Sequence, residues 1–310
     1  MYLNIVIPCY NEEAVLHETD RQLTALVGEW ISRGVLDDCR IVYVDDGSKD
    51  RTWAIIEELR QSGPYAHGLK LAHNVGHQHA LWAGLMHSVG QCDAVVSIDA
   101  DLQHDIRAIE EMVAAYREGC EVVYGVRNDR VTDSAFKKKT ALGFYRLMRK
   151  MGVDLIPNHA DFRLLGSHAL EALSQYPERN LFLRGMVRSL GFQERIIHFE
   201  CHDRFAGESK YTLRKMFNFA IDGITSFSVQ PLRMISLLGF IVVILALIAS
   251  IYALVAYFCG KTIQGWTSIL LSIWFLGGIQ LLCIGVLGEY IGKNYVEVKR
   301  RPRYIIEKEI

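Results

Sequence analysis

An acidic pair that follows a short apolar run is the feature of this sequence best suited to chemistry. Asp99 and Asp101 come at the end of the predicted strand Ala94–Ile98. Alternate residues of a strand point to the same side, so we expect the two carboxylates to face one ligand. Two carboxylates together suit a Mg²⁺ or Mn²⁺ ion that is also held by substrate phosphates. The pair therefore predicts a divalent metal site.

A second acidic pair, Asp45 and Asp46, ends the β-branched run Arg40–Val44 and precedes a Gly-Ser dipeptide. Adjacent carboxylates at the end of a strand can accept hydrogen bonds from a nucleobase edge or a ribose. A turn that caps the following helix is the alternative interpretation. Both interpretations stay open at the level of the sequence.

A third polar segment, Asn74–Gln78, opens a predicted helix. Gly76 permits a close backbone approach there, because glycine has no side chain to block a ligand. His77 and His79 lie two residues apart, a spacing that does not place both on one helix face. We therefore interpret these histidines as structural or substrate-lining residues rather than as metal ligands.

The elements that must position these residues alternate between strand and helix. The expected strands are Leu3–Ile7, Arg40–Val44, Leu69–Ala72, Ala94–Ile98 and Glu121–Val126. Helical patterns cover residues 12–33 and 77–90, and Asp50 can cap a helix between them. This alternation predicts an α/β fold with a mostly parallel, Rossmann-like, doubly wound sheet. Ligands bind at the carboxyl ends of strands in such sheets, which is where the acidic pairs fall.

Hydropathy is distributed unevenly along the 310 residues. Half of the residues are apolar, 22% are charged and the net charge is −1, which gives no electrostatic support for binding nucleic acid. No Asp, Glu, Lys or Arg occurs from Met234 to Gly260 or from Thr262 to Gly288, and each run has 27 residues. A helix of that length spans about 40 Å, against about 30 Å for a hydrocarbon core. The runs predict two membrane helices, at about 234–259 and 265–290, and argue against a purely soluble enzyme.

Basic residues flank the predicted hairpin on one side. Arg233 precedes the first span and the cluster Lys299–Arg303 follows the second, whereas Lys261 lies between the spans. The positive-inside rule then places both termini and the N-terminal part in the cytoplasm. Apolar residues at helical spacing within Leu213–Phe227 predict an amphipathic helix in the membrane interface, with a helix packed on the soluble domain as the alternative. The seven cysteines have no metal-like spacing, and we expect reduced thiols.

An ordered set of motifs makes the chain resemble a known family. The first motifs are Ile5–Glu13, Val44–Thr52, Asn74–Ala80 and Asp99–Gln103. Together they resemble the family 2 inverting glycosyltransferases of the GT-A fold. The later motifs are Asp161–Leu164, Arg204–Tyr211 and Gly223–Ser228. With the two spans that follow, they are similar to the bacterial polyprenyl-phosphate glycosyltransferases, and more distantly to the dolichyl-phosphate mannose and glucose synthases.

The resemblance implies a donor pocket, a metal site and an acceptor side. The implied donor-pocket residues are Pro8, Tyr10, Asn11, Glu12, Asp45, Asp46, Gly76, Gln78, Asp99 and Gln103. Asp99 and Asp101 would hold the metal, and Asp161 occupies the position of a catalytic base. The residues implied to contact the phosphates of the donor or the acceptor are Arg127, Arg130, Arg163, Arg204, Ser209, Lys210 and Tyr211. One departure is His104, because many relatives carry an acid directly after the glutamine.

The implied reaction transfers a sugar from a UDP-sugar to polyprenyl phosphate, such as undecaprenyl phosphate, with inversion. A phosphate monoester has a second pKa near 6, so the attacking oxygen is mostly ionised and a strong base is unnecessary. Asp161 can therefore position groups as readily as accept a proton. Arg204 and Lys210 would offset the repulsion between the two anionic substrates. Glucose and N-acetylglucosamine both fit, and the segments at Asn74–Ala80 and Asn158–Asp161 slightly favour N-acetylglucosamine.

Two other functions remain as alternatives. A processive polysaccharide synthase would carry more spans and an Arg-Trp dipeptide, which this sequence lacks. A non-catalytic membrane scaffold would not need Asp99 and Asp101, which are both present.

The expected organisation has four parts along the chain. They are a cytosolic catalytic domain over 1–211, a juxtamembrane helix over 212–232, the membrane hairpin over 233–292 and a cytosolic basic tail over 293–310. Glycines in the second span favour close helix contacts in a homo-oligomer, with a tetramer implied by the resemblance. The tail at Tyr304–Ile306 is expected to add a strand to a neighbouring molecule.

Overall fold

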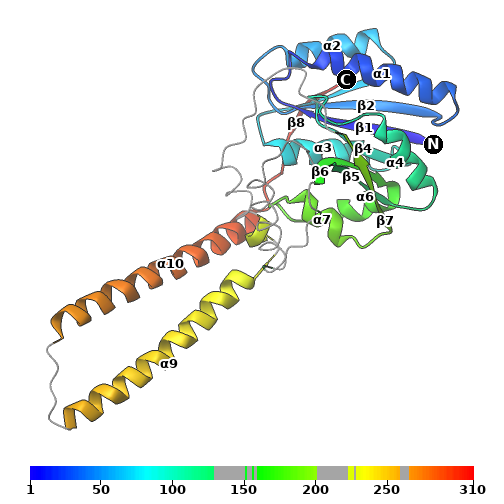
Figure 1. The fold of residues 1–310 in the computed structure, drawn as a ribbon. Coiled ribbons are helices and arrows are strands. Elements are labelled where there is room, and N and C mark those ends of the chain that lie inside the picture. Colours follow the sequence, from blue (N-terminus) through cyan, green and yellow to red (C-terminus); the bar gives the residue numbers. More distant parts are fainter. Residues whose placement is uncertain (129–150, 152–155, 157–158, 201–222, 227, 259–264) are drawn as a thin grey trace.

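The computed structural model describes residues 1–128, 151, 156, 159–200, 223–226, 228–258 and 265–310 (Figure 1). Five predicted site residues and most of the predicted juxtamembrane helix lie outside the described residues. The site residues are Arg130, Arg204, Ser209, Lys210 and Tyr211.

The N-terminal part is built around one eight-stranded sheet with the strand order β7-β5-β6-β4-β1-β2-β3-β8. The strands are β1 (Tyr2–Cys9), β2 (Asp38–Asp45), β3 (Ala66–Leu71), β4 (Ala94–Ser97), β5 (Val122–Arg127), β6 (His159–Gly166), β7 (Glu194–Phe199) and β8 (Ile306–Glu309). Strands β4, β1, β2 and β3 pair in parallel, and β6 runs antiparallel to both β4 and β5. The predicted mostly parallel sheet is confirmed, and all five expected strands are present.

Helices cover both faces of this sheet (Figure 1). They are α1 (Leu16–Ser32), α2 (Thr52–Ser62), α3 (His77–Ser88), α4 (Ala108–Arg117), α6 (Ser167–Ser174) and α7 (Leu183–Ser189). One core cluster joins α1, α2 and α4 to the sheet, and a second joins α3, α6 and α7 to the opposite face. In β1, Ile5 and Ile7 enter the first cluster while Val6 enters the second, because successive side chains of a strand point to opposite faces. The three layers are those of the predicted doubly wound fold.

The first helix begins later than the expected residue 12. Strand β1 runs on to Cys9, and Asn11 then takes a left-handed backbone conformation with φ 56°. The backbone N–H of Glu12 donates to the Thr52 hydroxyl at 2.9 Å, which holds the connection against α2. Residues 10–15 therefore form the connection between β1 and α1, which begins at Leu16.

Two long apolar helices extend from the domain as a hairpin (Figure 1). Helix α9 (Gln230–Phe258) and helix α10 (Trp266–Lys299) are each long and apolar enough to cross a membrane. Both run beyond the predicted spans: α9 takes in residues 230–232, which were assigned to the juxtamembrane helix, and α10 continues to Lys299. Most of the large apolar side chains described on these helices are exposed, as expected for surfaces that face lipid or other helices.

Residues 293–310, predicted to form a cytosolic basic tail, lie partly in α10 and partly in the sheet. Residues up to Lys299 belong to α10, and β8 pairs antiparallel with β3 of the same chain. Ile310 exchanges two backbone hydrogen bonds with Gly68, both at 3.0 Å. The expected strand addition thus occurs within the chain, where it covers the edge that β3 would otherwise leave unpaired. The sheet built by the N-terminal part therefore includes a strand from the end of the chain.

Candidate active site

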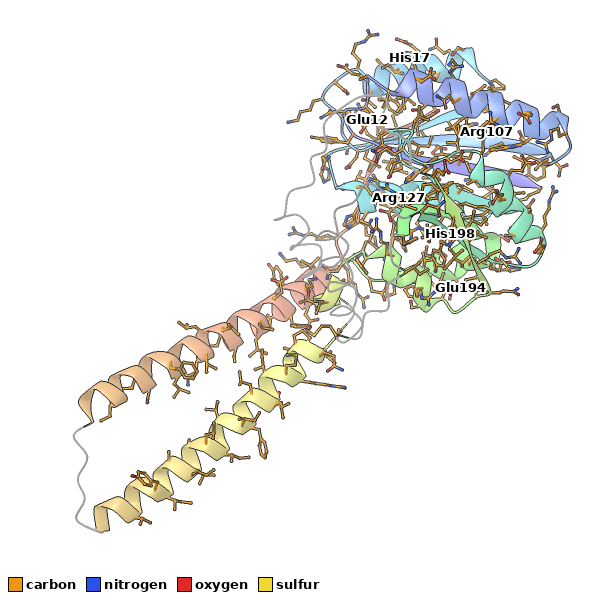
Figure 2. The ribbon with its side chains drawn as sticks, viewed as in Figure 1. Glu12, His17, Arg107, Arg127, Glu194 and His198 are labelled. Atoms are coloured by element: carbon orange, nitrogen blue, oxygen red, sulfur yellow. The ribbon has the colours of Figure 1, made fainter. Side chains whose placement is uncertain are left out.

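Polar side chains gather at the carboxyl ends of β1, β2 and β4, and Asp161 joins them from the start of antiparallel β6. Glu12, which follows β1, and Arg127, which ends β5, lie along this same edge (Figure 2). The predicted acidic residues thus meet at one edge of the sheet, as the parallel strand order requires.

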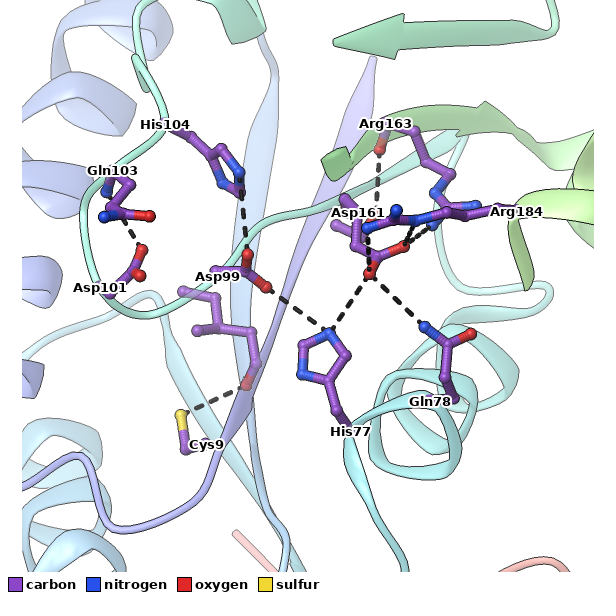
Figure 3. Close-up of polar contacts among 12 residues, drawn as sticks. Cys9, His77, Gln78, Asp99, Asp101, Gln103, His104, Asp161, Arg163 and Arg184 are labelled. Atoms are coloured by element: carbon purple, nitrogen blue, oxygen red, sulfur yellow. Dashed lines mark hydrogen bonds and ion pairs between the residues drawn. The ribbon is translucent and has the colours of Figure 1, made fainter. Parts of the chain in front are cut away.

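Asp161 is the centre of the largest group of contacts (Figure 3). Arg184 donates to it from Nε and Nη2, each at 3.2 Å, and Arg163 donates through Nη2. Gln78 Nε2 lies 3.5 Å from Asp161 Oδ2, and His77 Nε2 lies 3.7 Å from the same oxygen. Four side chains from three elements therefore converge on one carboxylate.

The charge state of Asp161 follows from these neighbours. Burial alone would raise its pKa, but the Arg184 and Arg163 guanidinium groups outweigh burial and hold the pKa well below the usual range. A carboxylate that is this acidic accepts a proton poorly. Between the two roles that the sequence left open, the contacts favour positioning over proton transfer.

Arg163, which was expected to contact a phosphate, donates a hydrogen bond to Asp161 in the structure. Its side chain is only 2% exposed and lies beside Asp161. Its Nε and Nη1 atoms are buried without a hydrogen-bond partner in the part of the chain that the structure describes. In the described structure Arg163 therefore pairs with the Asp161 carboxylate and has little surface open to solvent.

Asp99 lies between two histidines (Figure 3). Its oxygens are 3.6 Å from His77 Nε2 and 3.7 Å from His104 Nε2. His104 is buried and stacks on Phe162, with ring centroids 5.2 Å apart. Burial lowers the pKa of His104, which favours a neutral ring. His77 is thus a site residue, which fits the substrate-lining interpretation, and His104 fills the position where an acid was expected.

The metal pair does not sit in a strand as assumed. Strand β4 ends at Ser97, so Asp99 and Asp101 lie in the following turn, where strand alternation does not apply. Asp101 Oδ1 accepts the backbone N–H of Gln103 at 3.2 Å, and Leu102 has a left-handed φ of 56°. Among the described residues, no group of three or more metal-ligating side chains surrounds a common point. The partly exposed carboxylates fit a Mg²⁺ or Mn²⁺ ion that takes its remaining ligands from substrate phosphates and water.

Asp46 binds the loop that follows β3. Its two oxygens accept the backbone N–H groups of Val75 at 2.7 Å and Gly76 at 2.9 Å. Asp45 Oδ1 accepts the backbone N–H of Ser48 at 3.1 Å. Both aspartates are buried, and burial raises the pKa of each. Asp45 thus binds within its own turn and Asp46 binds the loop before α3, contacts that differ from a cap on α2. They leave little carboxylate surface for a nucleobase or a ribose.

A glycine lets these two loops meet. Gly47 has a φ of 66°, and a Cβ added there would lie 2.6 Å from the backbone nitrogen of Asn74. Gly76, with a φ of 90°, lies at the start of α3 on the other side of the contact. Any side chain at Gly47 would push the two loops apart.

The remaining predicted donor residues lie at the end of β1, in the loop that follows it and in the first turn of α3. Pro8 is buried within β1, whereas Tyr10 is 42% exposed. Asn11 Oδ1 accepts the backbone N–H of Lys49 at 2.9 Å. Gln78 is fixed from both ends of its amide, because Oε1 accepts the backbone N–H of Leu183 at 3.1 Å while Nε2 faces Asp161.

Arg184 is the main site residue that the sequence did not reveal. It belongs to the short helix α7 and lies 23 residues after its partner Asp161. An arginine in a short amphipathic helix carries no local signal of a buried ion pair. Arg127, by contrast, was expected near a phosphate, and its Nη2 lies 3.4 Å from His104 Nε2.

Comparisons with known proteins show which family the chain resembles. The family model described as glycosyl transferase family 2 matches residues 4–173. The uncharacterized glycosyltransferase YkoT of Bacillus subtilis (strain 168) is 54% identical over 306 residues, which cover 98% of this chain and 91% of YkoT. The prophage bactoprenol glucosyl transferase homolog of Escherichia coli (strain K12) is 39% identical over 313 residues, covering 99% of each chain.

A solved structure supports the fold. The mannosyltransferase PcManGT from Pyrobaculum calidifontis, in complex with GDP-Man and Mn²⁺, superposes with a TM-score of 0.51 at 17% identity, covering 72% of this chain and 63% of that chain. At this identity the likeness shows the fold alone, and the predicted GT-A architecture is confirmed.

Proposed function

The chain belongs to glycosyl transferase family 2, and we propose that it transfers a sugar from a UDP-sugar to polyprenyl phosphate at a membrane surface. The observation that carries the proposal is the position of Asp161 and its partners close to the base of the membrane hairpin. The segment Arg179–Leu183 contacts Gln78 in the site and Glu297 near the end of α10. An acceptor whose phosphate lies at the headgroup level would therefore meet the site beside the base of the hairpin.

The names of the relatives favour glucose as the sugar. Proteins named bactoprenol glucosyl transferase from Shigella phages SfII and SfV are 40% and 39% identical to this chain and match nearly its whole length. Bactoprenol is a polyprenyl lipid, which agrees with the acceptor class. We propose UDP-glucose as the first donor to test, with UDP-N-acetylglucosamine as the second.

The reaction needs a dianionic acceptor more than it needs a base. The acceptor phosphate, with a pKa near 6, attacks the anomeric carbon and displaces UDP in one step, which inverts that centre. Asp161, held ionised by Arg184 and Arg163, keeps the two arginines in place at the acceptor side. The exposed His77, beside Asp99 and Asp161, can donate a hydrogen bond to a donor phosphate or sugar.

The metal would be held by Asp99 and Asp101 together with the phosphates of the donor. When bound, it would stabilise the negative charge that develops on the leaving UDP. The chain's own contribution is to hold these carboxylates in a turn that the Gln103 backbone N–H fixes.

The arrangement in the membrane follows from the charge pattern. We place α9 and α10 across the bilayer with both chain ends and the catalytic domain on the cytoplasmic side. The catalytic unit then comprises residues 1–211 and β8, and the described part of 212–232 adjoins α9. A homo-oligomer packed through the glycine-rich face of α10 remains part of the proposal, with a tetramer as the expected state.

The experiment is a transfer assay with purified full-length protein in detergent. The protein is incubated with undecaprenyl phosphate, Mn²⁺ or Mg²⁺, and labelled UDP-glucose, UDP-N-acetylglucosamine or GDP-mannose in separate reactions. Labelled lipid from one UDP-sugar, lost with EDTA and with Asp101→Ala, is the expected result. No labelled lipid from any donor, with protein that still binds UDP, would contradict the proposal.

A further inference from the structure

The connection between α6 and α7 is bound by the end of the membrane hairpin. The Glu297 carboxylate accepts the backbone N–H groups of Arg179 and Asn180, each at 2.8 Å. It also accepts the Asn180 side-chain amide at 3.0 Å. Two carbonyls of the same helix end add to the contact: Lys293 O lies 3.4 Å from Asn180 Nδ2 and Arg300 O lies 3.3 Å from Arg179 Nη2.

Glu297 occupies an unfavourable place for an acid within its own helix. It lies in the last turn of α10, which ends at Lys299, and the helix dipole disfavours negative charge there. The two backbone N–H groups of the connection supply the compensating partners, through charge-assisted hydrogen bonds. The position of this acid is therefore explained by the catalytic domain rather than by α10.

The same connection also contacts α3, the helix that carries Gln78. The carbonyl of Arg179 lies 3.3 Å from His79 Nε2, and the backbone N–H of Leu183 donates to Gln78 at 3.1 Å. Within the described part of the chain no side chain caps the start of α7, and the Leu183 N–H finds its partner in Gln78 instead. Arg184 is the second residue of α7 and makes the two 3.2 Å bonds to Asp161.

We infer that Glu297 is a positioning residue for sugar transfer. It fixes the connection 179–182, and through it the first turn of α7, so that Arg184 meets Asp161 in the arrangement that the reaction uses. Docking of the hairpin onto the domain thereby becomes a condition for an assembled site. This inference rests on the proposed function and adds a residue that acts from the membrane side.

The test compares three variants of the full-length protein with the wild type. Glu297→Ala removes the acceptor, and Glu297→Gln keeps one oxygen and the shape of the side chain. Glu121→Ala is the matched control, because Glu121 also accepts a backbone N–H, that of Ala169, and binds a side chain, His168, but away from the cluster at Asp161. The measurements are kcat and KM for lipid-linked sugar formation, the affinity for UDP, and amide hydrogen exchange over residues 179–184.

The expected result is a fall in kcat for Glu297→Ala of up to about 100-fold, the size that a small misplacement of a catalytic group produces. UDP affinity stays at the wild-type value, exchange at residues 179–184 becomes faster, and Glu297→Gln recovers part of kcat. Wild-type kcat in Glu297→Ala, or an equal loss in Glu121→Ala, would overturn the inference. A wild-type protein that makes no lipid-linked sugar would instead contradict the proposed function, and the inference with it.

Discussion

The proposed donor side and the proposed acceptor side of the site are built in different ways. On the donor side, Asp46 and Gly47 meet residues 74–76 through bonds between a buried carboxylate and neighbouring backbone. On the acceptor side, Asp161 meets Arg163 and Arg184 through charged side chains. The donor side is thus shaped by loop backbone, and the acceptor side by ion pairs that must be brought together from separate elements.

This difference predicts how each side responds to change. Loops that are held by bonds to their backbone change conformation when a turn residue is replaced. We therefore expect such a replacement to lower the affinity for the donor. An ion-pair cluster keeps its backbone but leaves a buried charge unpaired when one member is removed. The two sides should therefore be separable by measuring donor affinity and turnover independently.

The largest effect is expected for Asp161→Ala. The change leaves Arg163 buried without its partner, so we expect the free energy of unfolding to fall by about 3–5 kcal/mol. Sugar transfer should be lost while UDP still binds to the folded fraction. Arg188→Ala, on the same helix as Arg184, removes a partly exposed ion pair with Glu194 and should change the free energy by about 1 kcal/mol or less. Similar losses in both variants, by urea unfolding, would contradict the account of the acceptor side.

A smaller effect is expected for Asp46→Ala. Two backbone N–H groups lose a charged acceptor, which should lower the free energy of unfolding by about 2–3 kcal/mol. UDP affinity should fall, because the loops after β2 and β3 no longer hold each other. Asp93→Ala is the control, since Asp93 also accepts a backbone N–H, that of Tyr2, at the opposite edge of the sheet. An unchanged UDP affinity of Asp46→Ala, measured by calorimetry, would contradict the claim that these loops shape the donor side.

The donor side could be predicted from the sequence to a large extent. Its residues fall within short motifs that directly follow strands, so strand order alone brought Asp46, Asn74 and Asp99 to one edge. What the sequence did not reveal is which of them bind backbone, because Asp45 and Asp46 are equally polar in the sequence and both prove buried.

The acceptor side was harder to predict for a physical reason. Arg184 and Glu297 belong to helices whose local patterns are ordinary, and their partners lie 23 and 117 residues away along the chain. Strand β6 was missed as well, since an antiparallel strand inside an otherwise parallel sheet breaks the alternation on which the prediction depended. Contacts of this kind exist only after folding brings the elements together.

Gln78 connects the two sides and should show an intermediate phenotype. Gln78→Ala removes the bond to the Leu183 backbone and the contact with Asp161, so we expect a loss of about 1 kcal/mol in the free energy of unfolding. Turnover should fall more than UDP affinity, because both lost partners lie on the acceptor side. Gln91→Ala, which removes a hydrogen bond to the exposed Arg40, is the control and should alter neither quantity. A fall in UDP affinity without a fall in turnover would instead indicate that Gln78 acts on the donor side.

The smallest expected effect is on the pH profile. The folded pKa of Asp161 is lowered, so its contribution to stability is present above the unfolded value of about 4 and is lost only as the pH falls below it. Between pH 5 and 8 Asp161 therefore stays ionised, and the acid limb of the rate should reflect the acceptor phosphate, near pH 6. The residual activity of Asp161→Asn, measured against pH, should still fall on the acid side near pH 6. If the variant's rate no longer falls there, Asp161 would be the catalytic base.

The most direct test of the central claim measures both products of one reaction. Purified full-length protein in lipid nanodiscs that contain undecaprenyl phosphate is supplied with UDP-glucose, and released UDP and lipid-linked glucose are counted together. We predict equal amounts of the two products, and no UDP release above background when the polyprenyl phosphate is left out. UDP release that continues at the same rate without the lipid, or without any lipid-linked sugar, would contradict transfer to a polyprenyl phosphate.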